Sequence, residues 1–166
     1  MVYWSTGPAA AESVEQTVSA TVSSQSVAIS VSPNVINYGT VGFEQSRSSL
    51  AAEAGNVTFV ATNTGNVPEL FSIRGSAAAG DGFTWDLTPS AVTCGALANM
   101  NKFRHRVNPL GGTPIFLTYL AEYLAVDPIA PSAGTSFTTE IYLPCLGSNG
   151  VGKTASTNIT VVATAP

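Results

Sequence analysis

The stretch NVTFVATNTGN, residues 56–66, combines a strand pattern with a turn. Apolar Val57, Phe59 and Ala61 occupy alternate positions, and Thr58, Val60 and Thr62 form the opposite face. This alternation, in a segment rich in β-branched residues, is typical of a half-buried β-strand. The Asn-Thr-Gly-Asn sequence that follows favours a turn. The stretch therefore predicts one strand of a sheet and the connection that ends it.

Other segments repeat the alternation, and turn-forming residues separate them. The clearest are QSVAISV at 25–31, SFTTEIYL at 136–143 and STNITVVAT at 156–164. We expect strands at about 14–22, 25–31, 57–63, 69–74, 83–87, 102–107, 136–143 and 155–164. A short helix is conceivable only over residues 117–125. The sequence predicts an all-β protein, an antiparallel β-sandwich of about seven to nine strands with immunoglobulin-like or jelly-roll topology.

The composition fits one domain with a polar but weakly charged surface. The chain has 166 residues, of which 45% are hydrophobic and 10% charged, whereas roughly a quarter of a soluble globular chain is usually charged. Such surfaces are common in secreted and virion-surface β proteins. The net charge of −4 argues against nucleic-acid binding, which normally needs clustered cations. We expect an extended N-terminal arm at 1–13 and a single sandwich domain at 14–166.

Neither a membrane span nor a secretory signal is expected. The most apolar run, residues 114–126, is shorter than the roughly 18 residues that a span needs, and it contains Glu122. The N-terminus lacks a basic region followed by an apolar segment. Either a signal was removed before this numbering begins, or the protein is made without export. The Met1 residue favours the second interpretation.

Cys94 and Cys145 are the two cysteines of the chain, and two interpretations stay open. A disulfide would close a loop of about 50 residues and stabilise the fold by roughly 3–5 kcal/mol. Alternatively, both are buried free thiols. Together with the one histidine they cannot build a four-ligand zinc site without carboxylates, so we expect no metal site.

The stretch GSNGVGKT, residues 147–154, matches the phosphate-binding pattern G-x-x-x-x-G-K-[ST]. Such a loop must lead into a helix whose N-terminus holds the phosphates. Here the residues after Thr154 alternate as a strand does and are too few for a nucleotide-binding domain. We therefore expect a hairpin loop that joins the last two strands, with positive φ at Asn149 and Gly150. Lys153 should be exposed, and no nucleotide or other cofactor is expected.

The segment NKFRHRV, residues 101–107, places Lys102, Arg104 and Arg106 on one face of a predicted strand. One interpretation is a cationic stripe that docks on an acidic neighbour, such as another copy of this chain. The favoured one is a solvated outer face, or an edge strand that its charges protect against aggregation.

His105 lies on the apolar face of the same segment and is the one histidine of the chain. Catalysis by a Ser/His/Asp or Cys/His arrangement would have to use it. No G-x-S-x-G motif accompanies it. We expect a packed, hydrogen-bonded histidine, no catalytic residues and no enzymatic activity.

Two strings carry a resemblance to a known class of modules. VAISVSPNVINYGTV at 27–41, followed by VTFVATNTGNVPELFSI at 57–73, resembles the opening strands of immunoglobulin-like modules in bacterial surface proteins and phage structural proteins. The resemblance implies a sandwich fold in a non-enzymatic structural protein, and it implies no active-site residues.

The first functional hypothesis is a structural subunit of a phage or virus particle, such as a capsid decoration (cement) protein on the virion surface. Its partners would be other protein subunits, including copies of itself in a homo-oligomer. Tyr3 and Trp4 would be aromatic anchors of the interface.

Two alternatives stay open. One is a secreted bacterial or archaeal filament subunit, extracellular or on the cell surface, that assembles by β-strand addition. The other is a carbohydrate- or ligand-binding module, in which Trp85, Tyr119 or Tyr123 would form an aromatic platform.

Overall fold

The computed structural model describes residues 24–95, 99–125 and 127–166. The expected arm at 1–13, with Tyr3 and Trp4, and the expected strand at 14–22 lie outside these ranges. The described residues form twelve strands and one short 3-10 helix, η1 (Ala52–Ala54). The strands are β1 (Ile29–Ser32), β2 (Ser46–Ser48), β3 (Phe59–Asn63), β4 (Leu70–Gly75), β5 (Ala78–Gly80), β6 (Phe83–Leu87), β7 (Lys102–Pro109), β8 (Ile115–Phe116), β9 (Glu122–Tyr123), β10 (Gly134–Tyr142), β11 (Ala155–Ser156) and β12 (Ile159–Thr164).

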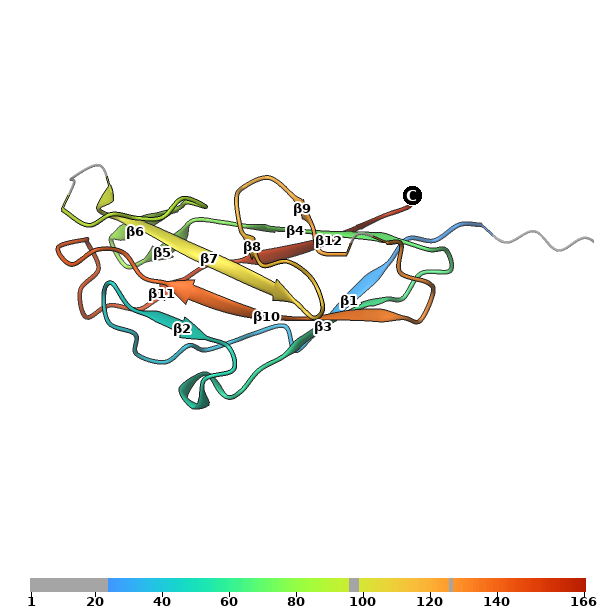
Figure 1. Cartoon of the computed structure of the whole chain (residues 1–166), viewed down its shortest axis with the longest axis horizontal. Coiled ribbons are helices and arrows are strands. Elements are labelled where there is room, and N and C mark those ends of the chain that lie inside the picture. Colours follow the sequence, from blue (N-terminus) through green and yellow to red (C-terminus); the bar gives the residue numbers. More distant parts are fainter. Residues whose placement is uncertain (1–23, 96–98, 126) are drawn as a thin grey trace, which may run out of the picture.

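The strands form two sheets of unequal width (Figure 1). Nine strands make the larger sheet, in the order β1-β3-β10-β7-β6-β5-β11, with β2 added to β10 and β8 added to β7. The smaller sheet has three strands in the order β12-β4-β9. The all-β prediction is confirmed.

One pairing departs from the expected antiparallel sandwich, because β6 and β7 run parallel, with Leu87 opposite Phe103. A parallel pair needs a connection of about a dozen residues or more to return the chain to its starting end. Residues 88–101 provide such a connection. The larger sheet is therefore mixed rather than antiparallel throughout.

The core lies between the inner faces of the two sheets. From the larger sheet, Phe103 and Val107 on β7 and Phe137 on β10 point inward, and from the smaller sheet, Phe71 and Ile73 on β4 do so. The period-two pattern of the sequence thus sorts buried from exposed residues correctly in these strands.

Gly75 at the end of β4 explains how closely the two sheets approach each other. A Cβ atom at this position would lie 2.6 Å from Leu87 Cδ2 and 3.2 Å from Leu117 Cβ. A side chain at this position would therefore require Leu87 and Leu117 to shift.

Two local expectations are wrong. Residues 117–125 form no helix, because the chain there leaves β8 and pairs briefly with β4 through β9, where Tyr123 lies opposite Ser72. The segment 155–164 is not one strand but two, β11 and β12, which belong to different sheets. Thr157 and Asn158 interrupt it through hydrogen bonds with Ser76.

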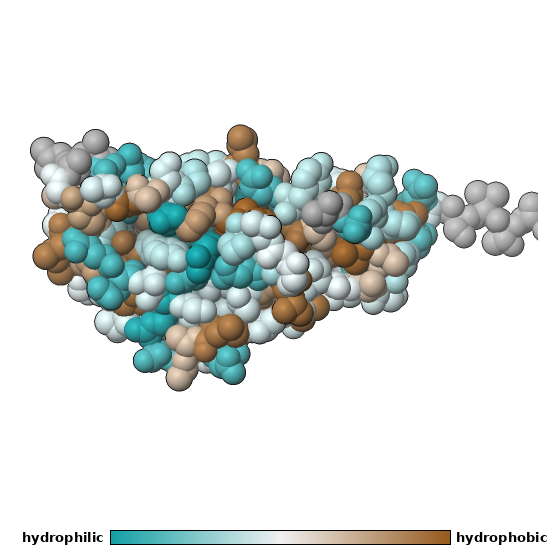
Figure 2. Space-filling model, in the orientation of Figure 1, coloured by the Kyte–Doolittle hydropathy of each residue, from teal (hydrophilic) through white to brown (hydrophobic). Residues whose placement is uncertain are grey.

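The surface carries large apolar side chains in small groups among polar residues (Figure 2). Leu110, Leu120 and Leu146 are the most exposed leucines among the described residues. Across the described ranges, no helix is long and apolar enough to cross a membrane.

Candidate binding cleft

A cleft of about 980 Å³ opens on one side of the sandwich. One wall is the segment that follows β1, residues 33–41, and the other consists of parts of residues 150–161. The floor is the inner face of the larger sheet. Its largest side chains are Phe59, Trp85, His105, Phe137, Ile141 and Leu143.

Aromatic side chains give this floor its shape. The rings of Phe59 and Phe137 stack with their centroids 5.2 Å apart. Phe43 meets Trp85 edge to face at 5.9 Å. The Trp85 indole N–H donates to the Asn149 carbonyl oxygen at 2.8 Å, so its one polar atom is satisfied and the floor there is apolar.

Polar side chains interrupt the apolar floor where Tyr38, from one wall, reaches His105. The Tyr38 hydroxyl lies 2.9 Å from His105 Nε2 and 2.5 Å from Thr139 Oγ1. Burial lowers the pKa of His105 to about 4 and raises the pKa of Tyr38 to about 12. Both side chains are therefore uncharged near neutral pH. His105 Nδ1 has no hydrogen-bond partner among the described residues.

β12 borders the cleft and is the end strand of its sheet. Ser76 N–H donates to the Asn158 carbonyl oxygen at 3.0 Å, so Asn158 is hydrogen-bonded toward β4. In an antiparallel ladder the peptide groups of alternate residues point to opposite sides. Those of Ile159, Val161 and Ala163 therefore point away from β4. Within the described ranges, no hydrogen bond reaches this outer edge.

The side chains of β12 follow the same alternation. Ile159 and Val161 line the cleft and pack against the core, yet both stay half-buried. Thr160, between them, is exposed on the opposite face. The cleft thus combines an unpaired strand edge with an apolar face.

The glycine-rich loop 147–154 closes one end of the cleft. Gly150 has φ = 93°, and a Cβ atom there would lie 2.7 Å from the Phe83 ring. A strand follows the loop, as predicted, but the expected hairpin is wrong because β10 pairs with β3 and β7 whereas β11 pairs with β5. Asn149 does not adopt the expected positive φ. Lys153 is exposed, and its Nζ donates to the Asp81 carbonyl oxygen at 2.8 Å.

The predicted cationic stripe lies on the outer face of β7, away from the cleft. Lys102, Arg104 and Arg106 share this face, but two of them have partners in the chain. Arg106 forms an ion pair with Glu140 on β10, and the Arg104 guanidinium lies 3.7 Å from the centroid of the Phe116 ring. β7 also lies between β6 and β10, so protection of an edge strand is the wrong explanation for these charges.

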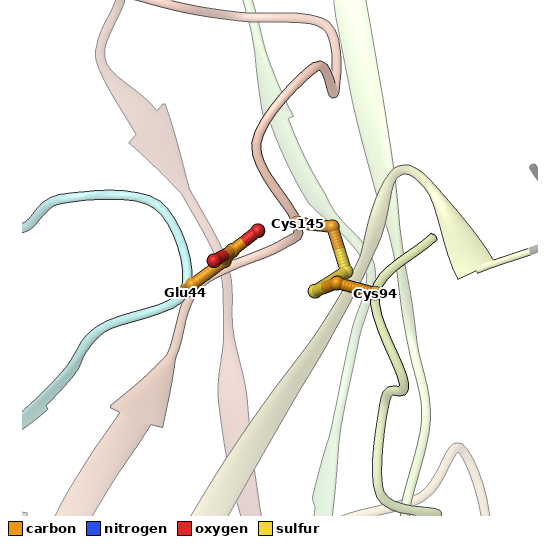
Figure 3. Close-up of side chains that lie close together, drawn as sticks. All are labelled: Glu44, Cys94 and Cys145. Atoms are coloured by element: carbon orange, nitrogen blue, oxygen red, sulfur yellow. A yellow bond between two sulfur atoms is a disulfide. The ribbon is translucent and has the colours of Figure 1, made fainter. Parts of the chain in front are cut away.

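Cys94 and Cys145 form a disulfide (Figure 3). Their sulfur atoms and the Glu44 carboxylate lie within 4.8 Å of one another, the one such grouping of potential metal ligands within the described ranges. Sulfur in a disulfide is not the thiolate that binds metals. The Glu44 Oε1 atom instead accepts a hydrogen bond from Leu146 N–H at 3.0 Å.

The three aromatic residues of the expected ligand platform do not share a surface. Trp85 is only 4% exposed and belongs to the core. The Tyr119 hydroxyl accepts a hydrogen bond from Leu87 N–H, and Tyr123 projects from β9. Trp85 therefore cannot contribute to an exposed platform, whereas Tyr119 and Tyr123 are exposed.

Comparison with known proteins returned no relative: no family model, no curated protein and no solved structure matches the chain. The resemblance to immunoglobulin-like modules therefore stays a prediction. The sequence does place His105 correctly as a buried, hydrogen-bonded residue. It does not reveal Tyr38 or the cleft, because both depend on segments far apart in the chain.

Proposed function

We propose that this protein is a non-enzymatic structural subunit that joins other protein chains by accepting a β-strand at the edge of β12. One observation carries the proposal: the peptide groups of Ile159, Val161 and Ala163 point away from β4, and Ile159 and Val161 line the cleft. An exposed edge of this kind is a template for pairing with another chain. Main-chain hydrogen bonds would supply affinity, and the cleft would select the inserted side chains.

The unpaired edge favours a filament-like assembly, in which each subunit completes its neighbour's sheet, over the decoration of a capsid. The setting would be extracellular or on a cell surface. A decoration protein on a virion surface is the other setting of the same proposal, since a strand from a capsid protein would use the same edge.

Proline at position 161 tests the proposal. The Val161 N–H points away from β4, so Val161→Pro removes a donor of the outer edge and leaves the ladder with β4 intact. We expect wild-type protein to assemble with rising concentration and Val161→Pro to stay monomeric, as measured by light scattering after size-exclusion chromatography. Val161→Thr keeps the N–H and a branched side chain, and it should assemble as the wild type does.

Circular dichroism would verify that both variants are folded. A wild-type chain that stays monomeric at every concentration would refute the proposal. Assembly of Val161→Pro equal to that of the wild type would show that the edge is not used.

A ligand-binding module is the second candidate, and the size of the cleft favours it. About 980 Å³ is near the upper end of the range of small-molecule sites, roughly 300–1,000 Å³. The Tyr38 hydroxyl would be the polar group that orients a ligand. Glycan or small-molecule binding by the monomer, lost in Tyr38→Phe but kept in Val161→Pro, would establish this function instead.

A further inference from the structure

We propose that the strand accepted by the cleft is residues 14–22 of a second copy of this chain. The inference rests on the proposed function and names its partner. Each copy would then be both donor and acceptor, and copies would join head to tail into an open chain.

In residues 14–22, VEQTVSATV, apolar and polar residues largely alternate, as we expect of an inserted strand. The even positions are Val14, Gln16, Val18, Ala20 and Val22. They present four apolar side chains and one amide to a single side of a strand. The odd positions are Glu15, Thr17, Ser19 and Thr21, all polar. One side therefore suits the apolar floor, and the other suits solvent.

The dimensions of such a strand match the edge that it would join. Nine extended residues span roughly 30 Å, and the six residues of β12 span roughly 20 Å. The segment is therefore long enough to pair with the part of β12 that lines the cleft, Ile159 to Val161, with its even side chains toward Phe59 and Phe137. Valine and alanine are compact apolar side chains, which suits a cleft with an aromatic floor.

Charge also allows the insertion. Among the described residues that line the cleft, Lys153 is the one that carries a charge, since His105 is neutral. Glu15 is the one charged residue of the inserted segment and lies on its polar side. No unpaired charge would be buried, so the large cost of desolvating one does not arise.

Hydrogen bonds fix the described start of the chain, residues 24–28, against the sandwich. The Asn66 side chain forms two hydrogen bonds with these residues. Its Oδ1 atom accepts from Ser26 N–H at 2.7 Å, and its Nδ2 atom donates to the Ser24 carbonyl oxygen at 2.8 Å. Ala28 N–H donates to Glu69 Oε1 at 2.8 Å. These bonds lie at the end of the molecule opposite to the loop between β10 and β11 (Figure 1). To fill its own cleft, the segment would have to reverse direction immediately before Ser24.

A matched pair of substitutions in the full chain tests the donor. Val18→Asp places a charge on the side that enters the cleft, and Ser19→Asp places the same charge on the side that faces solvent. We expect Val18→Asp to raise the concentration of half-maximal assembly about 100-fold or more, because its carboxylate would be buried without a partner. Ser19→Asp should shift it less than about threefold.

Mixing two variants tests the direction of assembly. Val18→Asp cannot donate but has an intact cleft, whereas Val161→Pro cannot accept but has an intact segment. Each alone should stay monomeric, and an equimolar mixture should form dimers and nothing larger.

The outcomes separate this inference from the proposed function. If the wild type assembles and Val18→Asp assembles equally well, the cleft takes another strand, and the inference fails while the proposed function stands. A mixture that stays monomeric would also overturn the inference. If the wild type is monomeric and Val18→Asp lowers its unfolding free energy, the segment fills its own cleft, and both proposals fail.

Discussion

The two halves of the sandwich contain the same types of apolar residue but bury them to different extents. In the closed half, Phe71, Ile73 and Leu117 have no measurable exposure. In the open half, along the cleft, Ile159 and Val161 stay half-buried although they belong to the same sheet as Phe71 and Ile73. The difference comes from position in the sheet, because β4 lies between β12 and β9 whereas β12 is an end strand. The alternation of apolar and polar residues in a sequence thus predicts which face of a strand points inward, but it does not predict which element covers that face.

The same substitution in the two halves should give the largest contrast. Ile73→Ala leaves a cavity between two packed sheets, and we expect a loss of up to about 5 kcal/mol in unfolding free energy. Ile159→Ala removes a side chain that the cleft already exposes, so it should cost about 1 kcal/mol in the monomer. Urea unfolding of the monomeric form measures both. Equal losses would mean that the cleft is closed in solution.

Loss of the disulfide should destabilise both halves because it ties the β6–β7 connection to the end of β10. Its cysteines are 51 residues apart, so the chain-entropy relation gives about 4 kcal/mol. Cys94→Ser should show this loss, and Cys145→Ser slightly more because Cys145 is buried. Guanidinium unfolding with and without reductant checks the effect. If reductant leaves the wild-type midpoint unchanged, this prediction is wrong.

The pH dependence of the unfolding free energy should indicate whether water reaches the floor of the cleft. The unfolded chain takes up a proton on His105 near its ordinary pKa of 6.5, but the folded chain does so only near pH 4. The free energy of unfolding should therefore fall by up to about 3 kcal/mol as the pH decreases from about 6.5 to about 4. This decrease should be absent in His105→Gln, whatever the absolute stability of that variant. A histidine pKa near 6.5, measured by NMR in the folded protein, would show that water reaches the floor.

Substitutions in the loop 147–154 should have the smallest effects on stability. These effects should differ between residues that are close together in the loop. Gly150→Ala introduces a Cβ atom against the Phe83 ring at positive φ, which should cost about 2 kcal/mol. Lys153→Ala removes an exposed side chain and should change stability by less than about 0.5 kcal/mol. Thermal unfolding compares the two. Magnesium-dependent nucleotide binding that Lys153→Ala abolished would contradict the assignment of this loop.

The sequence predicts the fold class and most long strands because alternation is a local property. Five strands of two or three residues, including β8 and β9, are too short to show a period. This explains why the count exceeds the expected seven to nine. The parallel pairing of β6 and β7 and the division of 155–164 between two sheets depend on partners distant in sequence.

The candidate site is less predictable than the fold. Burial of His105 follows from its place between Phe103 and Val107, and the structure agrees. The cleft itself joins residues 33–41 to residues near 160, and no local pattern connects these segments. The stripe of Lys102, Arg104 and Arg106 is evident from the sequence, but the partners of its arginines are not. Arg106 pairs with Glu140 and Arg104 packs on Phe116, and both partners lie on other strands.

The hydrogen bonds that hold Ser24–Ala28 also determine how the protein would respond to mechanical force. Tension applied through the N-terminal segment enters the sandwich at Asn66 and Glu69 and then passes along β1, which pairs antiparallel with β3. Force along a strand loads the ladder in shear, so its hydrogen bonds must fail together and not one by one. If copies join through residues 14–22 as proposed, the assembly would resist stretching at the point where one copy is connected to the next.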